Sequence, residues 1–205
     1  MEKENYGLQI EKSSCRKSLF FHFLFQILLG IVFAFLNILL CCLNTNFKIP
    51  LYMDTVFTVA ASFFSLTAGL VCAALFHFFW KFIWDFQVFV FAWSICSFTL
   101  VLVIRFYVLK HRKITMVDIL FLIFLLAIII SFEGAVIFAV LSAAVNYSES
   151  SQVRFMYALL ESANVPAFLA ALLPRIPVNI LDKAISVTAG YLCYEGLCRI
   201  FPKLR

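Results

Sequence analysis

The sequence predicts an all-α, polytopic membrane protein with six transmembrane helices, and three observations lead to this fold class. First, 64% of the 205 residues are hydrophobic and only 13% are charged, which is too few charges to cover the apolar surface of a soluble domain. Second, runs such as ILFLIFLLAIII (residues 119–130) lack the apolar and polar alternation of membrane β-barrels. Third, the positive charges favour one membrane topology over another.

A polar, mixed-charge lead at residues 1–18 precedes the first apolar block, and residues 19–205 form a single six-helix membrane domain. The first block covers residues 19–43. It is longer than the apolar region of a signal peptide, and no small-residue cleavage site follows it. We therefore expect a membrane span here, followed by a short connection at residues 44–50.

The stretch from Ile49 to Trp80 decides the topology. As one straight helix, residues 54–80 would extend about 40 Å at ~1.5 Å per residue, whereas the hydrocarbon core of a bilayer is only ~30 Å thick. Small residues at positions 65–69 offer an alternative, a hairpin of two short helices of about 13–16 residues each. Length alone leaves both arrangements open.

The positive charges favour the hairpin, which gives six spans with both termini in the cytoplasm. Eleven Lys and Arg residues then lie on the cytoplasmic side and four outside, as the preference of short basic segments for the cytoplasm predicts. With a single span, the basic cluster at residues 105–113 and the basic C-terminal tail fall opposite the basic N-terminus, and the bias is far weaker. The eleven are Lys3, Lys12, Arg16, Lys17, Arg105, Lys110, Arg112, Lys113, Arg199, Lys203 and Arg205, and the four are Lys48, Lys81, Arg154 and Arg175.

Three further spans complete the predicted domain. The fourth covers residues 87–109 and ends in the basic cluster, and the fifth covers residues 115–145. The last helix is expected to begin at Pro177, because proline suits the first turn of a helix, and to continue to about residue 201. The long connection before it contains a segment, residues 152–172, that is either a loop or an amphipathic, half-inserted helix.

In this topology, most strongly polar side chains of the spans fall in the outer half of the membrane. A charge near the bilayer centre costs about 2.5–3.5 kcal/mol on insertion scales, and it normally faces polar partners or a water-filled cavity. Several such residues at one depth therefore predict a substrate cavity that is open to the outside. The candidate substrate-binding residues are Asp54, Thr55, Thr58, His77, Trp93, Glu133, Asn179, Asp182 and Lys183.

Most of these candidates also have a purely structural interpretation. Asp54 could be the N-cap of the second helix, and Asp182 suits the positive start of the last helix. Lys183 could extend to the membrane interface or form a structural ion pair with either aspartate. His77 could be an interfacial residue, whereas Glu133 is hardest to explain structurally because burying it unpaired is expensive.

Gly30 and Ala34 form a small-xxx-small pair that lets another helix approach closely, either from a partner subunit or from within the chain.

No nucleotide-binding, metalloprotease, kinase or Ser/His/Asp motif is found, so we expect no enzyme activity and no cofactor. The seven cysteines lack metal-ligand spacing, so no metal site is expected. The net charge of +5 follows from topology and does not indicate nucleic-acid binding.

Two segments and the six-helix layout resemble the substrate-binding S components of energy-coupling-factor (ECF) transporters. Residues 50–69 combine a proline, an Asp-Thr pair, a second threonine, small residues and a glycine, as helices two and three do in that family. Residues 174–191 provide a similar proline-containing entry to the last helix. The family's Ala-xxx-Ala docking face on helix one is replaced here by Gly30 and Ala34, a departure at the expected docking surface.

The resemblance implies a multi-pass protein of the cytoplasmic membrane that binds a vitamin-like micronutrient from the outside, with the connection after the first helix as a lid. It also implies partners, a transmembrane T component and two ATPase subunits, besides membrane lipid. The alternative function is a membrane sensory or ligand-binding module without transport activity. A small membrane enzyme that acts on lipids is a third class, but the sequence offers it no catalytic constellation.

Overall fold

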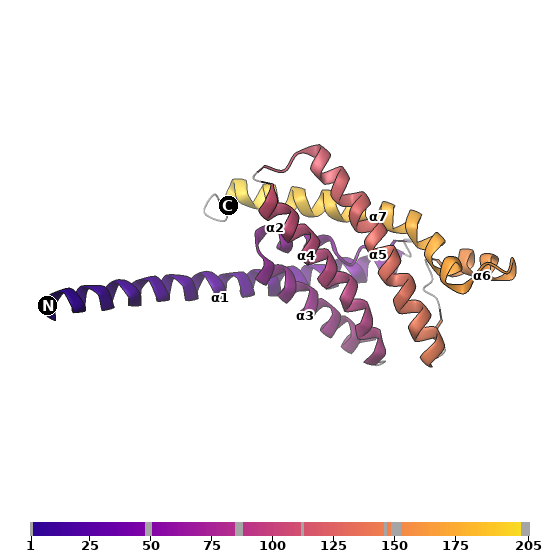
Figure 1. Cartoon of the computed structure of the whole chain (residues 1–205), viewed down its shortest axis with the longest axis horizontal. Coiled ribbons are helices and arrows are strands. Elements are labelled where there is room, and N and C mark those ends of the chain that lie inside the picture. Colours follow the sequence, from indigo (N-terminus) through magenta and orange to yellow (C-terminus); the bar gives the residue numbers. More distant parts are fainter. Residues whose placement is uncertain are drawn as a thin grey trace.

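The computed structural model describes residues 2–47, 51–84, 88–111, 113–145, 147–148 and 153–201. All regular elements within these ranges are helices, which confirms the all-α prediction. In chain order they are α1 (Glu2–Phe47), α2 (Val56–Phe64), α3 (Leu66–Trp84), the 3₁₀-helix η1 (Val88–Trp93), α4 (Ser94–Lys110), α5 (Met116–Val145), α6 (Arg154–Ser162) and α7 (Ala167–Ile200). Figure 1 shows that α1 extends far beyond the other helices at its N-terminal end.

Three helices in the described ranges are long and apolar enough to cross a membrane: Phe20–Phe47, Phe91–Lys110 and Met116–Val145. A shorter apolar helix covers Leu66–Trp80. Large apolar side chains lie exposed along these helices, for example Phe35, which is 66% exposed. Such surfaces are stable against lipid rather than water, so the chain is a helical membrane protein.

Helices α2 and α3 form an antiparallel pair, because Thr58 Oγ1 on α2 lies 3.4 Å from Cys72 Sγ on α3. Ser65 between them is extended, with φ −160° and ψ 159°, and its Oγ accepts the Ala68 N–H at 3.0 Å. The predicted break between the two helices near residues 65–69 therefore exists, but it consists of Ser65 alone. The Ser65 side chain caps the start of α3. The arms have 9 and 19 residues instead of about 13–16 each.

Helix α7 begins at Ala167, so the prediction that the last helix starts at Pro177 is wrong. Both Pro174 and Pro177 lie inside α7, where each leaves one carbonyl of the preceding turn without its usual N–H donor. Residue 152 lies outside the described part, and the rest of segment 152–172 includes the short helix α6 and the first turns of α7. None of the α6 residues is buried.

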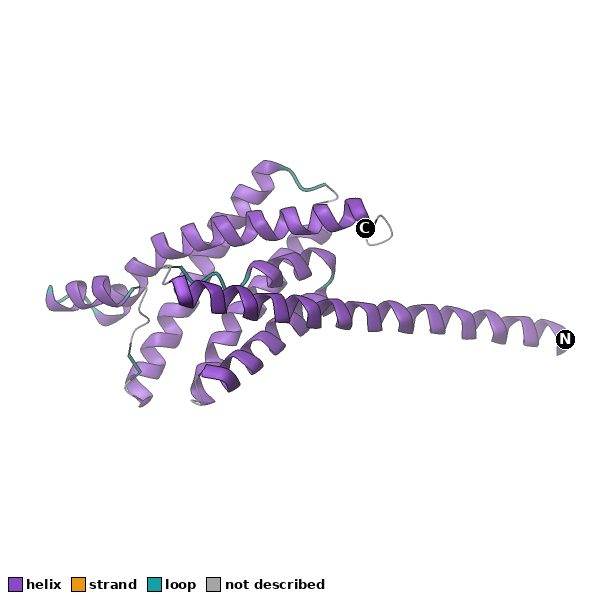
Figure 2. Ribbon diagram, turned by 180° about the vertical axis from the view of Figure 1, so that it is seen from behind, coloured by secondary structure: helices purple, strands orange, loops and turns teal. Residues whose placement is uncertain are grey.

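The pairs α2 and α3, α3 and α4, α4 and α5, and α5 and α7 run in opposite directions, so their ends meet at two ends of a bundle. At one end, Arg105 Nη1 of α4 donates to the Phe63 carbonyl of α2 at 3.3 Å. At the same end, the Tyr191 hydroxyl of α7 donates to the Ile114 carbonyl just before α5 at 3.4 Å. Figures 1 and 2 show that the N-terminal end of α1 and the C-terminal end of α7 lie on the same side of the bundle.

Small residues bring α1 into close contact with α3. A Cβ atom added at Gly30 would lie 2.8 Å from the Ala68 carbonyl oxygen and 2.9 Å from the Val71 side chain. Ala34, one turn further along α1, is only 2% exposed. The surface of Gly30 and Ala34 is therefore covered within the chain, as the internal-packing alternative expects.

Candidate functional site

A cavity of about 330 Å³ lies at the other end of the bundle, and α1, α3, α4, α5, α7 and the connection before α2 contribute to its lining. The cavity brings together polar side chains that are up to 142 positions apart in the sequence, from Cys41 to Lys183. Six of the nine predicted substrate-binding residues line it: Asp54, Thr55, His77, Trp93, Asn179 and Lys183.

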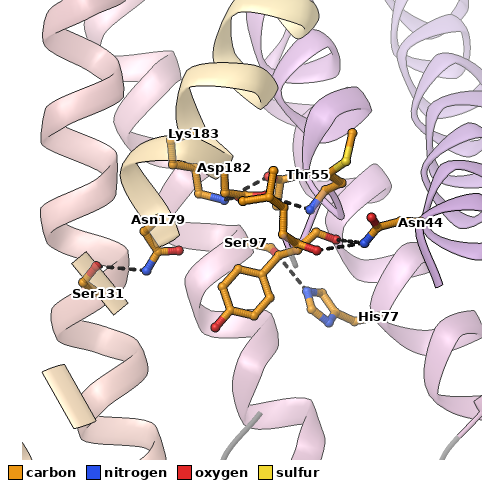
Figure 3. A network of polar contacts seen from close by, with 11 residues as sticks. Asn44, Thr55, His77, Ser97, Ser131, Asn179, Asp182 and Lys183 are labelled. Carbon is orange, nitrogen blue, oxygen red and sulfur yellow. Dashed lines mark hydrogen bonds and ion pairs between the residues drawn. The ribbon is translucent and has the colours of Figure 1, made fainter. Parts of the chain in front are cut away.

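A buried ion pair ties the connection before α2 to α7 (Figure 3). Lys183 Nζ donates to Asp182 Oδ2 at 2.7 Å and to Thr55 Oγ1 at 3.0 Å. The Met53 N–H donates to Asp182 Oδ1 at 2.7 Å. Asp182 is 0% exposed and Lys183 3%, so the two buried charges compensate each other. The pairing of Lys183 with Asp182 is the structural bridge that the sequence allowed.

Asp182 also holds the backbone of Met53 in an unusual conformation. Met53 has a φ of 48°, in the left-handed region that residues other than glycine adopt only at some cost. Its N–H bond to Asp182 keeps this conformation in place. Asp182 therefore positions the connection that carries Asp54 and Thr55, and it lies behind the cavity lining.

Two side-chain hydrogen bonds fix the orientation of further lining residues (Figure 3). His77 Nε2 on α3 lies 2.7 Å from Ser97 Oγ on α4, and Asn179 Nδ2 on α7 donates to Ser131 Oγ on α5 at 2.9 Å. His77 is only 6% exposed, so it lies inside the bundle. These bonds join α3 to α4 and α5 to α7 around the cavity.

Thr58 lies outside the cavity lining, in a contact that joins α1 to α2. Asn37 Nδ2 donates to Thr58 Oγ1 at 2.7 Å, and Asn37 Oδ1 accepts the Phe57 N–H at 2.9 Å. The first N–H groups of a helix lack partners within that helix, so Asn37 caps α2 from a different helix. The N-cap residue of α2 is Thr55 and makes no side-chain cap bond, so Asp54 is not the N-cap.

Glu133 also lies outside the cavity lining, between α5 and α4. Thr99 Oγ1 donates to Glu133 Oε1 at 2.7 Å. Its Oε2 atom is buried and has no hydrogen-bond partner among the residues that the structure describes. The next residue, Gly134, lines the cavity, which shows how one step along a helix moves a side chain to another face.

Arg175 is a cavity residue that the sequence reasoning missed. It is 2% exposed, and its Nη1 donates to the Ala171 carbonyl at 2.7 Å. The guanidinium carbon lies 5.3 Å from the ring centre of Phe138 and 5.8 Å from that of Trp93, distances typical of cation–π contacts. A Cβ atom added at Gly134 would lie 3.2 Å from Arg175 Nε, so glycine leaves room for this cation.

Aromatic side chains, the end of α1 and small or apolar residues of α4 and α5 supply the other lining residues that the sequence reasoning missed. Trp80 and Phe76 stack on α3 with ring centres 5.9 Å apart. Their spacing of four residues, which places both rings on one helix face, was the available signal. The missed lining residues are Cys41, Asn44, Thr45, Tyr52, Phe76, Trp80, Cys96, Ser97, Leu100, Ile130, Gly134, Tyr147 and Arg175.

Two polar atoms of lining residues are buried without a hydrogen-bond partner among the described residues: Asn44 Oδ1 and Trp93 Nε1. Buried polar atoms are nearly always paired in folded proteins, and burial without a partner is unfavourable. A bound molecule that pairs with both atoms would remove this penalty. The cavity lining therefore includes one residue with an unpartnered acceptor, Asn44, and one with an unpartnered donor, Trp93.

Comparisons with models of protein families, with curated proteins and with solved structures found no match to this chain. The resemblance to S components stays a prediction from two sequence segments, and its Pro50 lies outside the described residues, as do positions 48 and 49 of the expected lid. No group of three or more His, Cys, Asp or Glu side chains within the described ranges could hold a metal ion.

Proposed function

We propose that this chain is a membrane-embedded, substrate-binding subunit for the uptake of a vitamin-like micronutrient. The observation that carries the proposal is the cavity of about 330 Å³, with its buried charges, aromatic rings and two unpartnered polar atoms. Sites for small molecules have volumes of roughly 300–1,000 Å³, so this cavity suits a ligand at the small end of that range.

In this proposal, six segments cross the cytoplasmic membrane, and α2 and α3 form two of them. Both termini lie in the cytoplasm, and the cavity opens to the outside. The helices that follow one another along the chain alternate in direction, which supports this arrangement. Arg105 and Tyr191 both make their contacts at the end opposite the cavity. The bias of positive charge towards that end supports it as well.

The proposed partners follow from the need for an energy source, because the cavity can bind a small molecule but cannot by itself drive its transport. Binding a small molecule supplies no energy for transport, and the sequence predicts no nucleotide-binding motif. We therefore propose that a transmembrane T component and two ATPase subunits drive uptake. Membrane lipid surrounds the exposed apolar side chains, such as Phe21 at 68% and Phe35 at 66% exposure.

The first experiment identifies small molecules that leave the purified protein when it is denatured, by liquid chromatography and mass spectrometry. The wild type should release one vitamin-like compound. Gly134→Leu should release none, because the new side chain enters the space beside Arg175 and Trp93. Gly196→Leu is the matched control, since a Cβ atom at Gly196 has no neighbour within 4 Å, and it should release the same compound as the wild type.

The second experiment measures uptake of the released compound by cells that make the wild-type or Gly134→Leu chain together with the coupling subunits. Uptake that depends on the wild-type chain supports the transport proposal. A compound that binds but is never taken up would instead favour a sensory or ligand-binding module. Release of no compound from any variant would contradict both functions.

A further inference from the structure

Two residues of the cavity lining carry buried polar atoms of opposite hydrogen-bonding character. Trp93 Nε1 can only donate a hydrogen bond, and Asn44 Oδ1 can only accept one. Neither atom has a partner among the residues that the structure describes. A single ligand that satisfies both atoms must therefore carry at least one acceptor and one donor.

The orientation of the Asn44 amide is fixed by the backbone around it. Its Nδ2 atom donates to the Leu51 carbonyl at 2.8 Å and to the Tyr52 carbonyl at 3.4 Å. An exchange of the amide oxygen and nitrogen would place two carbonyl oxygens against a third, which the hydrogen-bonding pattern forbids. Asn44 therefore presents an acceptor, and Asn44 is only 8% exposed.

The unpartnered donor of Trp93 lies in a cationic and aromatic part of the site. The Arg175 guanidinium carbon is 5.8 Å from the centre of the Trp93 ring, and the Tyr147 ring centre is 6.4 Å away. Donors next to a guanidinium group pair best with a carbonyl or carboxylate oxygen. The stacked rings of Phe76 and Trp80 add flat apolar surface to the same cavity, which favours contact with a planar ring.

We propose that the ligand is a flat aromatic or heteroaromatic molecule with an N–H or O–H donor towards Asn44 and a carbonyl or carboxylate acceptor towards Trp93 and Arg175. The cavity volume of about 330 Å³ limits it to the size of one or two fused rings with short substituents. This inference rests on the proposed function, because it describes the substrate of the same site. It fails separately if the cavity binds a compound without these groups.

Three matched probes test the donor and the acceptor one at a time, by titration calorimetry on the detergent-solubilised wild type. Indole-3-carboxylate carries both groups, 1-methylindole-3-carboxylate lacks the donor, and 3-methylindole lacks the acceptor. We expect indole-3-carboxylate to bind best and each of the other probes to bind about tenfold more weakly, the effect of losing one buried hydrogen bond. This comparison requires no substitution in the protein.

Two variants assign each preference to its residue. In Asn44→Leu the difference between indole-3-carboxylate and its 1-methyl derivative should disappear, because the acceptor is gone. In Trp93→Phe the advantage of indole-3-carboxylate over 3-methylindole should shrink about tenfold. Gly196→Leu, in open space outside the site, should keep the wild-type order of the three probes.

The proposed ligand chemistry is overturned if the three probes bind equally well or if none binds. Equal binding means that water molecules satisfy both polar atoms. Absence of binding, together with release of a different compound from the purified protein, rejects the ligand class and leaves the proposed function intact. Absence of both binding and any released compound contradicts the proposed function itself.

Discussion

Replacement of Asp182 tests how the buried charges hold the site together. Asp182→Asn keeps an acceptor for the Met53 N–H but removes the charge opposite Lys183, whereas Asp182→Ala removes both. An unpaired charge left from a buried pair costs about 3–5 kcal/mol, and a buried N–H without an acceptor costs about 1–3 kcal/mol. The free energy of unfolding should therefore fall by about 3–5 kcal/mol in the first variant and by about 4–8 kcal/mol in the second.

Thermal unfolding in detergent, followed with a thiol-reactive fluorophore, measures this effect. Cys72 is 0% exposed, so in a chain whose other six cysteines are replaced by serine the dye reacts only when the bundle opens. In a chain of this size, 1 kcal/mol shifts the unfolding temperature by about 2–4 °C. Asp182→Asn should thus unfold about 6–20 °C below the wild type, and Asp182→Ala lower still.

A double variant provides the internal control. Asp182→Asn combined with Lys183→Met removes both charges, and replacement of a whole buried pair by neutral side chains is often close to neutral for stability. The double variant should therefore be more stable than Asp182→Asn alone. An unchanged unfolding temperature in Asp182→Asn, or a double variant less stable than the single one, would refute the assigned role of the pair.

Two further predictions concern packing and capping. Gly190→Ala should lower the unfolding temperature, because its Cβ atom would lie 2.7 Å from the Val56 carbonyl oxygen and overpacking costs about 1–3 kcal/mol. The matched Gly196→Ala should not lower it, and an equal unfolding temperature in both variants would contradict the close packing at Gly190. Asn37→Leu should speed hydrogen exchange of the Phe57 amide, which loses its acceptor, and an unchanged exchange rate would exclude Asn37 as the cap of α2.

The sequence predicted the helical fold because its apolar runs are long enough to need a bilayer. The fifth helix was expected at residues 115–145 and is observed at Met116–Val145, since polar residues border this run on both sides. The start of α7 was not predictable from local rules. Pro177 suits a helix start, but packing of the preceding turn against α5, with Arg175 buried there, extends the helix back to Ala167.

The site was predictable in part, because the membrane environment also restricts where polar side chains can lie. Charged and amide side chains in apolar helices must gather, so Asp54, Asn179 and Lys183 lie together around the cavity. Sequence alone does not say which helix face meets which neighbour, and Glu133 accordingly contacts Thr99 and lies outside the cavity lining. Asn44 was assigned to a connection because its neighbours are polar, whereas α1 continues to Phe47 and carries Asn44 to the cavity.

The central claim is that the cavity holds one small molecule, and native mass spectrometry of the intact protein tests it most directly. The wild type should carry a single bound compound in a one-to-one ratio. Gly134→Leu should lose it, and so should Thr45→Trp, in which an exposed lining residue becomes large enough to obstruct the cavity. A wild type without any bound compound, or a bound mass that both substitutions leave unchanged, would contradict the claim.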